Sequence, residues 1–249
     1  MQLGDRIKSY EKLETSDKFL PMVPIVARLD GRSFSKFTKK MDKPFDLGMT
    51  VSMMEVTKYL VEETGASVGY TQSDEITLIF LQKSYESDVF FAGKKQKMVS
   101  VLASLATAKF VQQALKLFPQ HCENKLPHFD CRVFQVPSKV EATNAILWRV
   151  QDAVRNSISM VAHEKFGHSA LMGKSTNDKL DMLMDSGINW NELNKCLKEG
   201  SFWKRETYTK IHEGNEVIRS HVTEVLKETK FDDLSTEQKV AFVFGEPKE

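Results

Sequence analysis

The chain has 249 residues, of which 41% are hydrophobic, so it can bury a substantial core as one large domain or two small ones. Lysine and arginine total 35 against 34 acidic residues, and the net charge of +1 excludes a global attraction to polyanions, so nucleic-acid binding must rely on local basic patches. Three unevenly spaced cysteines exclude a disulfide framework and favour a reducing, cytoplasmic setting, and no apolar run approaches the roughly 18 residues of a membrane span.

The first half of the chain alternates helical and strand patterns in an order that indicates one sheet. The patterns predict, in chain order, a helix over 3–18, a strand over 23–29, a helix over 46–63, strands over 66–70 and 75–82 joined as a hairpin, a helix over 94–117 and a strand over 131–136. After the first helix, this is the βαββαβ order of a ferredoxin-like antiparallel sheet with helices on one face. The predicted fold class is therefore α+β, with two layers.

Beyond Pro137 the pattern becomes mainly helical. Apolar spacing predicts helices over 139–164, 176–185, 189–198 and 213–229. No repeat or low-complexity linker separates the two parts. We therefore predict a domain of residues 1–137 and a mainly helical region of residues 138–249.

Acidic residues stand where predicted strands meet turns. Asp30 follows the first strand, and Asp74 and Glu75 precede the strand over 75–82. In a ferredoxin-like sheet these two strands are neighbours, so Asp30 and Asp74 are expected to share hard cations such as Mg²⁺ through oxygen ligands. The alternative is that both are ordinary turn formers.

The segment after Asp30 has the composition of a phosphate-binding loop. A glycine there lets the backbone approach a ligand, and successive N–H groups form an anion-binding concavity. The candidate residues are Gly31, Arg32, Ser33, Phe34 and Ser35, followed by Lys36, Lys39, Lys40 and Lys43. This loop would suit a triphosphate, whereas the alternative is a solvated basic loop.

Two further groups are candidates for contact with phosphate or RNA. Lys94 and Lys97 stand at a predicted helix start, where backbone amides and ammonium groups would converge. A later helix carries a polar face formed by Arg149, Gln151, Asp152, Arg155 and Asn156. Either group could instead be an ordinary solvated surface. Trp148, Trp190 and Trp203 are candidates for base stacking or for core packing.

Three motifs in this order resemble a known family. They are the run from Arg28 to Phe34, the pair Lys43 and Pro44 with Asp46 shortly after, and Gln72 to Glu75 before an apolar strand. Together they resemble the catalytic core of the tRNA-histidine guanylyltransferase family, including its bacterial-type "like" proteins, over roughly residues 3–185. The resemblance implies a palm fold like that of nucleic-acid polymerases, with extension of tRNA in the 3′ to 5′ direction.

The resemblance also implies roles for individual residues. Asp30, Asp74 and the Gly31 carbonyl would hold two Mg²⁺ ions, and Glu75 would support them. Residues 31–35 with Ser73 would hold the triphosphate, Lys43 would lie near the reacting nucleotide, and Lys179 would touch triphosphate or the tRNA 5′ end. ATP or GTP would activate the tRNA 5′ phosphate, and the 3′-hydroxyl of an incoming GTP or other nucleotide would then attack it. The family also implies a homotetramer.

A later block departs from the family pattern. Residues 148–157 align with a segment in which eukaryotic members carry a histidine, and here that position is Val154, while Asp152 and Asn156 are retained. This favours the bacterial-type members, which repair 5′-truncated tRNAs by templated addition. A nucleotide cyclase that uses the same carboxylates, and a non-catalytic RNA-binding module, remain alternative hypotheses.

Overall fold

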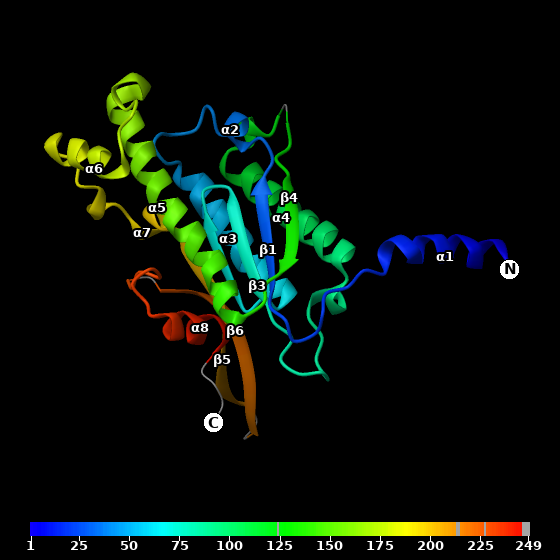
Figure 1. Cartoon of the computed structure of the whole chain (residues 1–249). Coiled ribbons are helices and arrows are strands. Elements are labelled where there is room, and N and C mark those ends of the chain that lie inside the picture. Colours follow the sequence, from blue (N-terminus) through cyan, green and yellow to red (C-terminus); the bar gives the residue numbers. More distant parts are fainter. Residues whose placement is uncertain (124, 213–214, 227, 246–249) are drawn as a thin grey trace.

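A single antiparallel sheet organises the computed structural model, which describes residues 1–123, 125–212, 215–226 and 228–245. The strand order is β4-β1-β3-β2-β5-β6 (Figure 1). The strands are β1 (Ile25–Gly31), β2 (Val68–Gln72), β3 (Glu75–Phe80), β4 (Phe129–Gln135), β5 (Ser201–His212) and β6 (Asn215–Val225). The first four positions, with a helix between β1 and β2 and another between β3 and β4, confirm the predicted ferredoxin-like arrangement.

The helices are of very different lengths. They are α1 (Leu3–Thr15), α2 (Phe34–Phe37), α3 (Leu47–Thr64), α4 (Lys95–Leu117), α5 (Lys139–Ala170), α6 (Thr176–Asp185), α7 (Lys195–Lys198) and α8 (Thr236–Phe244), with short 3-10 turns η1 (Phe90–Gly93), η2 (Pro119–His121) and η3 (Trp190–Glu192). The start of α3 is fixed by Asp46, whose side chain accepts a hydrogen bond from the Met49 amide at 2.8 Å. Figure 1 shows α1 projecting away from the body, and α1 has no buried residue.

One face of the sheet packs against α3 and α4. Because side chains alternate along a strand, Ile25, Ala27 and Leu29 of β1 share this face and form a buried cluster with residues such as Leu60 and Phe110. By length and composition, α4 is the one described helix that could cross a membrane. It nevertheless contributes its apolar side to this cluster, as a core helix does.

The opposite face is covered by a layer that the sequence did not indicate. Val26 and Tyr70 pack there against Ala142, Ile146 and Val150 of α5, and α8 joins the same cluster. In Figure 1, α5 crosses in front of the sheet while α3 lies behind it. Strands between two helical layers are buried on both sides, which explains the nearly continuous apolar runs of β1 and β3.

The predicted helix over 213–229 is wrong where the structure describes it. Residues 215–225 form β6, which pairs with β5 as a long hairpin, while residues 213, 214 and 227 lie outside the described part. The predicted helix over 189–198 is reduced to η3 and α7. The reason is tertiary: β5 pairs with β2, placing Phe202 in the α5 cluster and Trp203 in the α3 cluster. The division at residue 137 stays a prediction, although the sheet takes strands from both sides of it.

The junction between α7 and β5 requires a glycine. Gly200 has a φ of 78°, and a Cβ there would lie 2.4 Å from the Thr71 carbonyl oxygen. We expect Gly200→Ala to lower the free energy of unfolding by roughly 2–4 kcal/mol, since it adds a backbone clash to the strain of a left-handed conformation. Urea denaturation measures this loss.

Gly173→Ala is the matched control for this substitution. Gly173 has a φ of 74° but no neighbouring atom within 4 Å of the added Cβ, so its substitution should cost only about 1–2 kcal/mol. Equal losses at the two positions would contradict a role for the close approach between β2 and β5.

Candidate active site

The end of β1 is tied to the turn between β2 and β3. The Gly31 amide donates a hydrogen bond to the Asp74 carbonyl at 3.0 Å, and Asp30 is the Cα partner of Glu75 in the register. Paired residues in an antiparallel ladder point to the same face, so Asp30 and Glu75 share a face beside Asp74. Asp30 and the pair Asp74 and Glu75 therefore lie close together at one end of the sheet. The expected metal chemistry depends on this proximity.

The carboxylates of Asp30 and Asp74 repel each other unless a positive charge is bound between them. Burial raises the pKa of Asp74, and the negative charge of Asp30 raises it further, although a hydrogen bond from the Ser73 hydroxyl at 3.1 Å acts in the opposite direction. Among the described residues, no basic side chain contributes to offsetting this repulsion at Asp74. We call Asp30 and Asp74 the acid pair.

The acid pair has the donor chemistry that suits Mg²⁺. The described residues contain no group of three or more His, Cys, Asp or Glu side chains arranged to hold a metal, so a cage made by the protein alone is not present there. Mg²⁺ usually binds through one or two carboxylates and completes its shell with water and substrate phosphates. Two mutually repelling, partly buried carboxylates facing a cavity fit that pattern.

Glu75 is engaged by Arg149 of α5 instead of being free. The Arg149 Nε lies 2.6 Å from Glu75 Oε1, and Nη2 lies 2.8 Å from Oε2. Arg149 Nη2 also contacts Asp152 at 2.9 Å, and Asp152 in turn contacts Arg155 and Asn156. Burial raises the pKa of Glu75, while Arg149 opposes that rise. The predicted polar face of the helix is thus partly an internal ion network.

The loop after β1 is held rigidly. A Cβ at Gly31 would lie 2.4 Å from the Phe34 ring, so only glycine lets the chain turn there. Phe34 packs against Phe110 and Phe129, which anchors the loop in the core. Ser33 has a φ of 59° and Ser73 one of 49°. Left-handed conformations are uncommon for serine and concentrate at functional sites, so these two positions beside the acid pair strengthen the interpretation of a binding loop.

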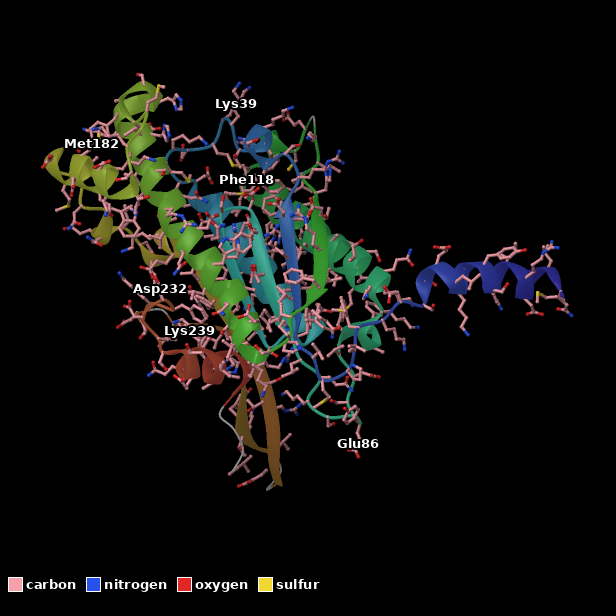
Figure 2. The ribbon with its side chains drawn as sticks, in the orientation of Figure 1. Lys39, Glu86, Phe118, Met182, Asp232 and Lys239 are labelled. Carbon is pink, nitrogen blue, oxygen red and sulfur yellow. The ribbon has the colours of Figure 1, made fainter. Side chains whose placement is uncertain are left out.

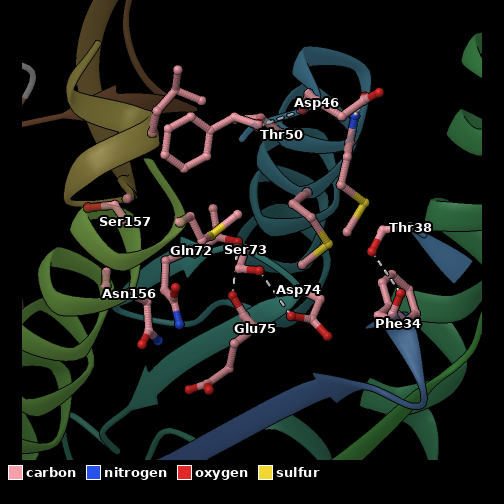
Figure 3. A pocket seen from close by; sticks show the side chains of 18 of the residues that line it. Phe34, Thr38, Asp46, Thr50, Gln72, Ser73, Asp74, Glu75, Asn156 and Ser157 are labelled. Atoms are coloured by element: carbon pink, nitrogen blue, oxygen red, sulfur yellow. Dashed lines mark hydrogen bonds between the residues drawn. The ribbon is translucent and has the colours of Figure 1, made fainter. Parts of the chain in front are cut away.

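A cavity of about 650 Å³ opens above the acid pair. Figure 3 shows Ser73, Asp74 and Glu75 on its floor, Thr50 of α3 and its capping residue Asp46 on one wall, and Asn156 and Ser157 of α5 on another. Its lining includes most residues predicted from the sequence: Asp30, Gly31, Ser33, Phe34, Ser35, Lys43, Ser73, Asp74, Glu75, Arg149 and Asn156. This volume lies in the range of small-molecule sites.

Sequence reasoning missed several residues that line the cavity. They are Met49 and Met53 of α3, Ser157, Ser159, Met160 and His163 of α5, and Cys196, Leu197, Gly200 and Ser201 before and within β5. In the last group, Cys196 and Leu197 lie where a helix was predicted and Gly200 and Ser201 lie just beyond it, so the prediction did not connect them with the site. Ser201 is 4% exposed, and its hydroxyl has no hydrogen-bond partner among the described residues, which leaves it available to a ligand.

Several candidate residues lie outside the cavity lining. Lys94 and Lys97 lie beside η1, whose Phe90 stacks on Phe80 at the opposite end of the sheet from Asp30. Five residue steps along β1 correspond to about 17 Å. Arg32, Asp152 and Arg155 also lie outside the lining, whereas Lys179 reaches its wall by donating to Ser159 at 3.0 Å.

The tryptophans divide between surface and core. Trp190 and Trp203 are buried, so they pack in the core, while Trp148 is 53% exposed. The guanidinium of Arg28 lies over the Trp148 ring at 5.5 Å, and that of Arg149 lies over it at 4.5 Å. Of the three, Trp148 is the one that retains the predicted possibility of stacking on a base.

Comparisons with known proteins converge on one family. A sequence model described as tRNAHis guanylyltransferase matches residues 4–137. The tRNA(His) guanylyltransferase of Schizosaccharomyces pombe is 31% identical over 217 residues, covering 80% of this chain and 79% of that protein.

Solved structures agree with the sequence comparisons. A bacterial tRNA(His) guanylyltransferase-like protein in complex with ATP has a TM-score of 0.84 and 34% identity, covering 98% of this chain and all of that one. A structure of such a protein in complex with GTP has a TM-score of 0.73 and 31% identity, covering 97% of this chain and 99% of that one.

We expect Asp74→Asn to stabilise the metal-free protein at pH 7.5. Because the pKa of Asp74 is raised in the folded state, the unfolded chain ionises it more readily, so ionised Asp74 costs stability at neutral pH. The gain in unfolding free energy should shrink as the pH falls through the raised pKa of Asp74 and vanish below the pKa of about 3.9 of an unfolded aspartate, where the carboxyl is protonated in both states. Urea denaturation with a chelator present measures it, and a loss of stability at pH 7.5 would contradict the repulsion.

Proposed function

Because the chain belongs to the tRNAHis guanylyltransferase family, we propose that it is a nucleotidyltransferase that adds nucleotides to the 5′ end of tRNA in the 3′ to 5′ direction. The observation that carries this proposal is the convergence of the acid pair with the loop of residues 31–35 at one cavity. ATP and GTP are the proposed nucleotide substrates, in keeping with the two bacterial structures solved with them.

Different residues of the cavity would bind the metal ions and the triphosphate. Asp30 and Asp74, with the Gly31 carbonyl, would hold two Mg²⁺ ions, which when bound activate an attacking hydroxyl and stabilise the charge on pyrophosphate. The backbone amides of residues 33–35 would orient the triphosphate together with Ser73, whereas the amides of Gly31 and Arg32 are engaged by the carbonyls of Asp74 and His128, and Lys43 adds a positive charge beside the cavity. Holding the reactants in line accounts for much of the rate in phosphoryl transfer.

The reaction consists of two displacements. In the first, an oxygen of the RNA 5′ phosphate attacks the α-phosphorus of ATP or GTP, and pyrophosphate leaves. In the second, the 3′-hydroxyl of the incoming nucleotide attacks the activated 5′ phosphate, its proton is lost, and the nucleoside monophosphate leaves. The first step forms a phosphoanhydride and the second a phosphodiester, but both are displacements at phosphorus that release a phosphate leaving group, so one site can serve both.

We propose 5′-end repair of truncated tRNA as the main task, and addition of guanylate to tRNA-histidine as a second one. The support is Val154, which stands where eukaryotic members have a histidine, together with the similarity to bacterial guanylyltransferase-like proteins. The family resemblance also leads us to propose a homotetramer, which sedimentation equilibrium of the purified chain tests directly.

Asp30→Asn and Asp74→Asn should each reduce extension by roughly 10³-fold or more, because each removes a carboxylate that would hold the Mg²⁺ ions needed to stabilise the charge on the reacting phosphate. The measurement uses a tRNA that lacks its first nucleotide, labelled at the 5′ phosphate, with ATP, GTP and Mg²⁺. Glu86→Gln is the matched control, since Glu86 is an exposed carboxylate far from the loop that carries Lys39 (Figure 2).

Three outcomes would redirect the proposal. Failure of the folded wild-type chain to extend any 5′-truncated tRNA would exclude it. A cyclic nucleotide formed without RNA would indicate a cyclase. Tight RNA binding that is indifferent to Mg²⁺ and to Asp74→Asn would indicate a non-catalytic RNA-binding module.

A further inference from the structure

The ion pair between Glu75 and Arg149 bears on how many negative charges the site presents. Glu75 lies directly opposite Asp30 in the register of β1 and β3, so the two carboxylates are on the same face of the sheet. The negative charge of Asp30 acts on Glu75, as it also acts on Asp74. Without a counter-ion, three carboxylates would therefore gather at the floor of the cavity.

Arg149 occupies both oxygens of Glu75. Its Nη2 donates a hydrogen bond to Oε2 at 2.8 Å, while its Nε lies 2.6 Å from Oε1 without the geometry of a hydrogen bond, so one hydrogen bond and one close charge contact hold the carboxylate. The two side chains are only 10% and 13% exposed. A pair this deeply buried breaks at high cost, because each charge would be left without a partner.

Arg149 is itself held in place by α5. Its Nη2 also contacts Asp152 at 2.9 Å, and its guanidinium lies over the Trp148 ring at 4.5 Å. The helix residues Ala142, Ile146 and Val150 pack on the sheet, so the position of Arg149 over Glu75 is set by the core. These contacts leave Arg149 poorly placed to bind a substrate phosphate, the role considered for it from the sequence.

We propose that Arg149 is a positioning residue that withholds Glu75 from the acid pair, so that the site takes up divalent cations with two carboxylates instead of three. This inference rests on the proposed function. It explains why the site can keep coordination positions open for substrate phosphates, since cation affinity rises with the number of charged ligands and a third carboxylate would compete with those phosphates.

The test measures Mn²⁺ binding to the full chain without nucleotide or RNA, by the loss of the free-ion electron paramagnetic resonance signal. Arg149→Met should bind Mn²⁺ roughly tenfold more tightly than the wild type, because Glu75 is released. Glu75→Gln leaves the Arg149 charge without its partner and should bind no more tightly than the wild type, whereas the double variant Arg149→Met with Glu75→Gln, which removes both charges, should return to the wild-type affinity. Thermal unfolding of each variant checks that it is folded.

Arg149→Lys keeps the experiment decisive if Arg149→Met does not fold. Lysine retains the charge but cannot make the two-point contact, so a smaller increase in Mn²⁺ affinity is expected, again removed by Glu75→Gln. Unchanged affinity in both Arg149 variants would overturn the proposal. Weaker binding by the double variant than by the wild type would also overturn it, because Glu75 would then be a ligand in the wild type.

The result of the Mn²⁺-binding experiment does not depend on whether the protein extends tRNA. Mn²⁺ binding requires neither tRNA nor turnover, so a chain that failed to extend tRNA could still give the predicted pattern of affinities. Conversely, active extension with unchanged Mn²⁺ binding in the Arg149 variants would leave the proposed function intact and remove only the role of Arg149.

Discussion

The register between β1 and β3 is the constraint on which the rest of the site depends. It sets Asp30 opposite Glu75, and the hydrogen bond from Gly31 to the Asp74 carbonyl then closes the floor of the cavity. A shift of one residue would send Asp30 to the opposite face, among the side chains of α3 and α4. The alternating burial of Ile25, Ala27 and Leu29 resists such a shift, so the hydrophobic core determines where the acidic groups stand.

α5 combines two tasks that are usually divided between elements. Its first turns cover the sheet through Ala142, Ile146 and Val150, and its middle turns supply Arg149, Asn156 and Ser157 to the site. A helix that is pinned by packing offers a firmer support for polar groups than a loop does. The cavity therefore lies between a rigid helix on one side and a loop anchored by Phe34 on the other.

Local patterns were sufficient for the parts of the fold formed by neighbouring segments. The hairpin of β2 and β3, the apolar strand before Asp30 and the capped start of α3 all have signals within a few residues, and the convergence of Asp30 with Asp74 follows from their order. The hairpin of β5 and β6 does have a local signal, because polar residues alternate with β-branched and aromatic ones there, but the prediction of a helix over 213–229 overlooked it, and the partner strand β2 lies far earlier in the chain. The engagement of Glu75 by Arg149 was equally hidden, since a polar helix face has the same pattern whether it meets water or another charge.

The cavity wall formed by residues 196–201 has a consequence for protein synthesis. The acid pair and the loop that follows β1 leave the ribosome early, and β4 completes the four-stranded part of the sheet, but Gly200 and Ser201 emerge only after α5 and α6. A nascent chain at that intermediate length contains the carboxylates of the cavity floor but lacks the residues 200 and 201 that line it from β5. The cavity can enclose a ligand only after β5 has been synthesised. The acid pair is therefore made well before the residues that complete the cavity lining.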